Sequence, residues 1–205
     1  MDAPKPSSLT NVFGLDNPQH IYTKMMVELM RFQDASSVWT KNEPFPESLF
    51  IAFNLAVTIW HMTDWLWMSS PTARQILKKR YSLQFDEKTQ SGLEKGLCGF
   101  QKAVRAERRS LHVCEEIANA SKHMRRRKTD PSIKAVVEWH EVIEAAGHAH
   151  KGDLLMSLSI VDNGKKQDAT LFFIDAIAYW EGLLRAQNLL SEDAILPQKI
   201  VKKQS

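Results

Sequence analysis

The sequence is poor in cysteine, with only Cys98 and Cys114 among its 205 residues. This excludes a disulfide-stabilised scaffold and fits a reducing compartment. Eight glycines and eight prolines exclude a collagen-like or low-complexity chain. No Gly-x-Ser-x-Gly elbow, phosphate-binding glycine loop or dinucleotide fingerprint is present. What remains is 43% hydrophobic and 25% charged residues, which is typical of a soluble globular protein of this length.

The N-terminal residues 1–8 lack the basic segment and apolar run of a secretory signal. The most apolar stretch, Leu49–Met68, is about as long as a membrane span, but it contains His61 and Asp64. Because an ionised carboxylate is costly in a bilayer, the stretch is better interpreted as a buried helix of a soluble bundle. We therefore expect a cytoplasmic protein with no membrane partner.

Cap residues, prolines and apolar spacing predict helices over residues 17–34, 46–69, 71–80, 94–107, 109–124 and 169–190, with loops over 35–45 and 81–92. An Asp-Asn-Gly-Lys turn at 162–165 predicts a hairpin that begins at Leu154. Residues 133–146 are ambiguous between strand and helix, and β-favouring residues favour a strand over the first half. The predicted fold class is mainly α, a bundle of five to six helices with a small antiparallel hairpin or sheet before the C-terminal helix. We expect an irregular arm over 1–16, one domain over 17–190 with a β insertion at about 133–168, and a basic tail over 191–205.

Charge is unevenly distributed along the chain, although the net charge is only +3. Residues 71–134 contain 16 basic and 7 acidic residues, a charge of +9, whereas the rest contains 11 and 17, a charge of −6. Such a basic region could bind the phosphates of RNA or DNA. It could equally be a solvated face, or contact the acidic remainder of this chain or of a second copy.

Polar residues form one stripe on each of two predicted helices. The first stripe is Asn54, Thr58, His61 and Asp64, and the second is His112, Glu116, Asn119 and His123. Steps of three and four residues place each set on one side of its helix. If the stripes meet, an Asp beside a His could prepare a general acid or base. The alternative is a polar network that satisfies itself and specifies the packing.

Metal binding is a further interpretation of these residues. His61 and Asp64 with His112 or His123 could supply three ligands, and His148 and His150 add a pair. No spacing matches a specific metal motif, so we expect neither a metal nor a cofactor. Cys98 and Cys114 are expected to be small core residues, and Trp60, Trp65, Trp67, Trp139 and Trp180 are expected to pack in the core.

One short segment carries a family resemblance. Residues 115–123, Glu-Glu-Ile-Ala-Asn-Ala-Ser-Lys-His, resemble the Asn-x-x-Lys-His signature of bacterial HEPN-like helical proteins. Residues 56–65 are similar to the first long helix of that group, and the late hairpin and the helix around residues 179–181 also fit it. The resemblance covers residues 45 to 190. It implies a helical bundle, often dimeric, that is associated with RNA cleavage or RNA binding in defence and toxin–antitoxin systems.

Active HEPN ribonucleases use an arginine four to six residues before the motif histidine, without a metal. Here those positions hold Glu116, Ile117 and Ala118, so the sequence departs from the pattern. In an RNA-directed protein of this kind, His123 would be the acid or base and Asn119 would orient it, with His61 and Asp64 facing them if the two polar stripes meet. Phosphate would be held by Lys122, Arg125, Arg126, Arg127 and Lys128. We expect a metal-independent ribonuclease or a catalytically degenerate RNA binder; the alternative is a non-enzymatic module that binds a protein partner or forms a homodimer.

Overall fold

The computed structural model describes residues 17–35, 38–39, 46–69, 71–122, 130–143 and 151–191. Within them lie six helices: α1 (Pro18–Asp34), α2 (Glu47–Ser69), α3 (Pro71–Arg80), α4 (Gln90–Glu107), α5 (Arg109–Lys122) and α6 (Ala169–Ala186). The strands are β1 (Val38–Trp39), β2 (Ile133–Glu141), β3 (Leu154–Asp162) and β4 (Lys165–Asp168). The prediction of a mainly α fold with a small antiparallel sheet before the last helix is confirmed. The expected arm over 1–16 and most of the expected tail lie outside the described residues.

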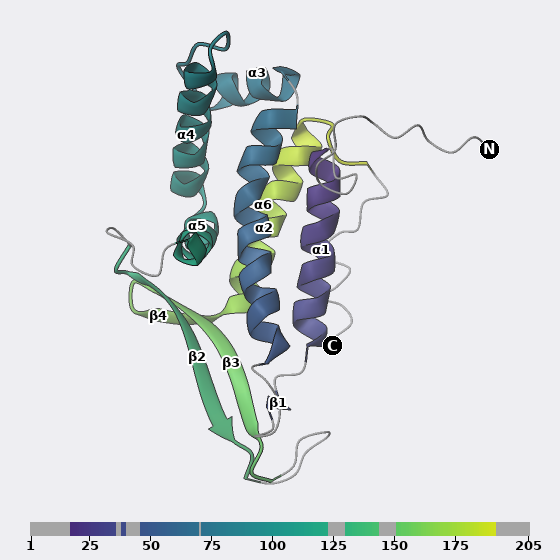
Figure 1. The fold of residues 1–205 in the computed structure, drawn as a ribbon, viewed down its shortest axis with the longest axis vertical. Coiled ribbons are helices and arrows are strands. Elements are labelled where there is room, and N and C mark those ends of the chain that lie inside the picture. Colours follow the sequence, from purple (N-terminus) through teal and green to yellow (C-terminus); the bar gives the residue numbers. More distant parts are fainter. Residues whose placement is uncertain are drawn as a thin grey trace, which may run out of the picture.

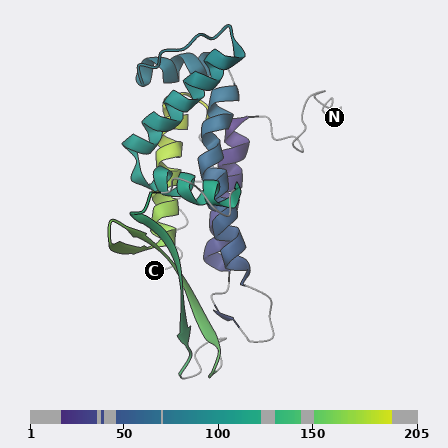
Figure 2. The same cartoon turned by 60° about the vertical axis from the view of Figure 1, so that its left-hand side comes forward.

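The helices α1, α2 and α6 stand side by side, and the β-sheet extends from one end of this group (Figure 1). Helices α3 and α4 lie toward the other end, and α5 crosses α2 (Figure 2). Short connections explain the arrangement of α3 to α5, because only Ser70 separates α2 from α3 and only Arg108 separates α4 from α5. The chain therefore changes direction at Arg108, between α4 and α5, and α5 packs against α2 and α6.

The core is aromatic and aliphatic, and most of it comes from α1, α2 and α6. Trp180 of α6 is fully buried and donates its indole N–H to the backbone carbonyl of Ile59 in α2 at 3.0 Å. Trp67 is also fully buried and donates to the carbonyl of Leu93 at 3.0 Å. Burial of these rings removes a large apolar area from water, and each buried N–H keeps a partner. The expectation of core tryptophans is wrong for Trp139, whose side chain is 40% exposed on the edge strand β2.

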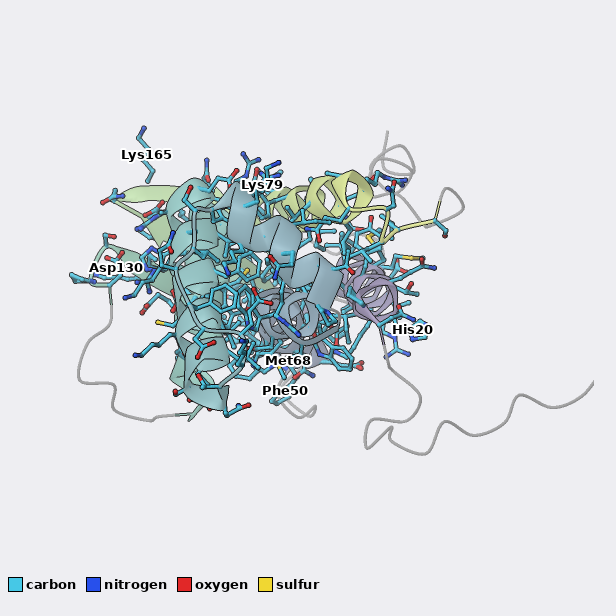
Figure 3. All side chains as sticks on the ribbon, turned by 90° about the horizontal axis from the view of Figure 1, so that it is seen from above. His20, Phe50, Met68, Lys79, Asp130 and Lys165 are labelled. Atoms are coloured by element: carbon cyan, nitrogen blue, oxygen red, sulfur yellow. The ribbon has the colours of Figure 1, made fainter. Side chains whose placement is uncertain are left out.

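Helix α2 is long and apolar enough to span a membrane, with a mean hydropathy of 1.2 over Glu47–Met68. Half of that segment is buried inside the bundle, as in the core helix of a soluble protein. Its exposed apolar residues include Phe50 and Met68, each 59% exposed. Seen along the bundle, both lie on the same side, opposite Lys79 of α3 (Figure 3).

Strand β3 is the centre of the sheet. β2 pairs with it antiparallel along all nine residues, and β1 and β4 pair with its other edge. The turn between β3 and β4 holds Asn163 and Gly164 at φ values of 49° and 78°, the left-handed conformation that Asn-Gly favours. The hairpin predicted at Leu154 is therefore confirmed, and the ambiguous segment forms a strand over Ile133–Glu141.

Two predicted helix boundaries shift, and one predicted loop contains a strand. Helix α4 begins at Gln90 rather than at residue 94, because the Thr89 hydroxyl accepts a hydrogen bond from the Gly92 N–H at 3.1 Å and caps the helix. The last helix ends at Ala186 rather than at residue 190, where Asn188 takes a φ of 56°. The segment predicted as a loop over 35–45 contains the two-residue strand β1, which is fixed by its pairing with β3.

Candidate functional site

The polar residues of α2 contact two different helices. The buried hydroxyl of Thr58 accepts a hydrogen bond from Lys24 of α1. Asp64 is half-buried and accepts from the Gln101 amide of α4 at 3.3 Å, and the same amide lies 3.1 Å from the Thr63 hydroxyl. His61 is also half-buried. The stripe seen in the sequence is therefore divided between α1 and α4, because its positions spread around the helix.

The polar residues of α5 turn toward the start of the sheet. His112 Nδ1 lies 2.8 Å from Arg109 Nη1 and 3.8 Å from an oxygen of Asp130, and His112 Nε2 lies 3.8 Å from Glu116 Oε1. Glu116 also accepts the Asp130 backbone N–H at 3.2 Å. Asn119 is half-buried one turn further along. The described contacts of His112 and Glu116 thus lead to Asp130 rather than to α2.

The predicted acid or base, His123, lies outside the described residues, as do the predicted phosphate-binding residues Arg125 to Lys128. Helices α2 and α5 do contact each other. The meeting of His61 and Asp64 with Asn119 and His123 stays a prediction.

Arg109, which the sequence placed among the basic residues, is the centre of an ion network. Its guanidinium donates to Asp162 at 2.7 to 3.1 Å, to Asp130 at 3.1 Å and to the Ser132 hydroxyl at 2.7 Å. The network joins the first turn of α5, the start of β2 and the end of β3. The hydrogen bonds from Arg109 to Asp162 raise the pKa of the guanidinium further. Arg109 therefore holds the sheet on the bundle and is already neutralised by two carboxylates.

Asp130 accepts hydrogen bonds from both Ser132 and Arg109 in this network. The hydroxyl and the backbone N–H of Ser132 donate to it at 2.6 and 2.9 Å, and together with Arg109 they lower its pKa to about 2. Because these donors favour the charged form, Asp130 stays an anion over the whole physiological range. It is suited to orienting Arg109 and His112 but not to releasing a proton near neutral pH.

Five of the ten basic residues over 71–121 have carboxylate partners. The ion pairs are Lys78–Glu87 at 3.1 Å, Arg80–Glu107 at 3.0 Å, Arg105–Glu115 at 3.2 Å and Arg108–Asp175. Two of the five paired residues, Arg108 and Arg109, bind acidic residues beyond the basic region, Asp175 and Asp162. This agrees with the interpretation that the basic region contacts the acidic remainder of the chain. Paired cations bind phosphate less well, so these five residues are weakened as nucleic-acid contacts.

A cluster of three potential metal ligands lies on α5, where side-chain atoms of His112, Glu115 and Glu116 lie within 4.8 Å of one another. Arg105 occupies the Glu115 carboxylate at 3.2 Å, and Arg109 occupies His112 Nδ1. Two adjacent guanidinium groups oppose a divalent cation electrostatically. The set of metal ligands considered from the sequence was a different one. Among the described residues His112 is grouped with these glutamates and not with His61 and Asp64. His148 and His150 lie outside the described residues.

Two tyrosines and a carboxylate form a cluster that the sequence did not indicate. The hydroxyls of Tyr81 and Tyr179 lie 2.7 Å apart and donate to the same oxygen of Glu107 at 2.9 and 2.8 Å. Burial would raise the pKa of Glu107, but the hydrogen bonds from Tyr179, Tyr81 and Arg80 lower it overall. Burial also raises the pKa of both phenols. The cluster joins α4 and α6 to the end of α3, and only tertiary packing brings its members together.

The two cysteines differ in their surroundings. Cys114 is fully buried, and burial raises the pKa of its thiol, so it is a core residue and not a nucleophile. Cys98 is exposed on α4, so the expectation that it packs in the core is wrong.

An apolar pocket of about 170 Å³ lies where α2, α5 and the sheet meet. Phe53 of α2, Ile117 of α5 and Val137 of β2 contribute to its lining. Phe53 and Val137 are 37% and 39% exposed. The pocket therefore opens onto an apolar surface and is suited to apolar contacts rather than to acid–base chemistry.

No protein-family model matches the chain, and comparisons with curated proteins and with solved structures give no match.

Proposed function

We propose that this chain is an RNA-associated protein of the HEPN-like type, in which the segment from Asn119 to Lys128 binds RNA and His123 is its acid or base. The observation that supports this is the contact between α2 and α5. These helices carry the two segments on which the family resemblance rests, and α3 and α4 lie between them in the sequence. A chance resemblance would not require the two segments to be neighbours in the bundle.

The charge distribution supports the same segment. Five of the ten basic residues over 71–121 are paired with carboxylates. The run over 122–128 places five basic residues within seven positions, which makes it the stronger candidate for phosphate contacts. In metal-free cleavage the RNA 2′-OH attacks the adjacent phosphate, a histidine moves the proton, and cationic groups stabilise the developing charge. Since no arginine precedes His123 at the family's spacing, RNA binding is the primary proposal and cleavage the secondary one.

The test measures retention and cleavage of labelled single-stranded RNA at two salt concentrations, with and without a chelator. Replacing Arg125, Arg126 and Arg127 together with Gln should weaken retention and make the salt dependence shallower by about two in slope, from about 0.7 per lost contact. The matched control replaces Lys88, Lys95 and Lys102 with Gln, which removes the same charge from the exposed face of α4 and its preceding turn. Equal retention by the two triple variants and the wild type would overturn the proposed interface.

Cleavage is tested with His123→Ala. Cleavage that resists the chelator and is lost in this variant would establish a metal-independent ribonuclease. Salt-sensitive retention without cleavage would establish a binder.

A second candidate function, a protein-interaction module, is favoured by the exposed apolar surface. Phe50, Phe53, Val137 and Trp139 are 37 to 59% exposed on α2 and β2. Such surfaces on soluble proteins mark interaction sites. If RNA is neither retained nor cleaved, this function replaces the first.

A further inference from the structure

Strand β2 forms one edge of the sheet. Among the described residues it pairs with β3 alone, whereas β3 is paired on both sides (Figure 1). Over the nine residues Ile133 to Glu141, every second residue therefore directs its backbone N–H and C=O groups to the outer side. An unpaired edge of this length is a template for pairing with another strand, which short length, bulges, proline and uncompensated charged side chains discourage. Strand β2 does carry charges, at Lys134, Glu138 and Glu141, so pairing requires a register that sets opposite charges against each other. Proline is absent from β2, and its register with β3 is continuous.

The two faces of β2 differ in chemistry. Ile133, Ala135, Val137 and Trp139 share the face that carries Met156, Leu158 and Ile160 of β3. The other face carries Lys134, Val136, Glu138 and His140. Val137 and Trp139 are 39% and 40% exposed, so the apolar face is only partly covered within the described residues.

We propose that two copies of this chain associate by antiparallel pairing of their β2 strands about a two-fold axis at Val136. A two-fold axis perpendicular to the sheet leaves every side chain on its original face of the sheet. Because residues that lie opposite each other must share a face, the pairing has to be centred on a residue and not between two residues. Centred on Val136, the pairing sets Lys134 of each copy opposite Glu138 of the other. It also sets Ile133 opposite Trp139 on the apolar face.

The neighbouring registers are less complementary. Centred on Ala135, the pairing sets Lys134 opposite Val136 and Ser132 opposite Glu138, with no opposite-charge pair. Centred on Val137, the pairing sets Glu138 opposite Val136 and Lys134 opposite His140. Centred on Glu138, it sets two carboxylates opposite each other, which is destabilising. The register at Val136 is therefore selected by two opposite-charge pairs and two aromatic–β-branched pairs, the kinds of cross-strand pair that stabilise antiparallel sheets.

Glu138 also binds Lys166 of β4 across the sheet within its own chain. A carboxylate has acceptor sites for more than one donor, so Lys134 of the second copy completes a three-residue charge network. This inference deepens the interaction function and does not rest on RNA binding.

The test is sedimentation equilibrium of the full chain and of two charge-reversal variants. The wild type should have twice the 23.5 kDa mass of one chain. Lys134→Glu sets Glu opposite Glu at both ends of the pairing, and Glu138→Lys sets Lys opposite Lys, so each variant alone should dimerise at least about tenfold more weakly. An equimolar mixture of the two variants sets Glu opposite Lys at both positions and should restore a dimer that contains one copy of each.

The mixture separates pairing from misfolding, because a variant that had lost its fold would not be rescued by the other. The control is Lys95→Glu, a charge reversal on the exposed face of α4, which should leave the dimer unchanged. A wild type of single-chain mass would overturn the proposal. The proposal would also be overturned if both charge-reversal variants dimerised as strongly as the wild type, or if the equimolar mixture of the two variants formed no dimer. RNA retention is measured separately on the Arg125–Arg127 variant, so failure of one proposal does not count against the other.

Discussion

Arg109 and Asp162, 53 residues apart in the sequence, are joined by a bidentate ion pair with a shortest distance of 2.7 Å. The pair links the first turn of α5 to the end of β3. The guanidinium is 37% exposed and the carboxylate 18%, so water screens the pair only in part. It fixes how the sheet leaves the bundle, and thereby the position of the pocket and of β2.

Replacing Arg109 with Lys should destabilise the protein by about 1–2 kcal/mol, because an ammonium keeps the charge but cannot bind Asp162, Asp130 and Ser132 together. Urea unfolding measures the change. Arg31→Lys in α1 is the matched control and should change the free energy of unfolding by no more than about 0.5 kcal/mol. Equal stability of the two variants would show that the network is not structural.

The protein should lose stability in acid as the Asp130 carboxylate becomes protonated. Its pKa is about 2 when folded, below its ordinary value of 3.8, so the charged form is favoured by folding. The resulting stability is complete above the ordinary value and is lost as the pH falls from 3.8 toward 2. Urea unfolding of the wild type and of Asp130→Asn across this range measures it. The difference between the two proteins should shrink as the pH falls; a constant difference would contradict the lowered pKa.

Gly96 and Gly182 should respond oppositely to alanine. A Cβ on Gly96 would lie 2.4 Å from Trp67 and 2.7 Å from Phe85, so Gly96→Ala should destabilise the protein by about 1–3 kcal/mol. A Cβ on Gly182 would meet nothing within 4 Å, so Gly182→Ala should stabilise α6 by about 0.5–1 kcal/mol. Thermal unfolding of both variants tests the close packing of α4 on α2. A shift of the same sign in both would refute it.

The three tyrosines of the sequence should all resist ionisation in the folded protein. Burial raises the pKa of Tyr22, Tyr81 and Tyr179, and carboxylates add to it: Glu181 for Tyr22 and Glu107 for the other two. Since the neutral forms are favoured by folding, this stability is complete below the unfolded value of 10 and is lost as the pH rises above it. The phenolate absorbance should therefore increase together with unfolding. In urea the same residues should titrate near 10; identical curves with and without urea would contradict the prediction.

The sequence by itself determined the helices, the hairpin and the mainly α class, because these depend on local signals. Asn17 and Pro18 start α1, and Asn163-Gly164 supplies the left-handed turn that joins β3 to β4. The apolar length of α2 determined that it would be central. Only tertiary structure decided the charge partners, because ion pairs such as Arg108–Asp175 join residues that no local spacing relates. It likewise divided the α2 stripe between Lys24 and Gln101, since helix packing selects which side of a polar stripe meets which neighbour. The position of β2 at the edge was also decided by the tertiary structure. Its sequence predicts a strand, but only the order of the strands in the sheet places that strand at the edge.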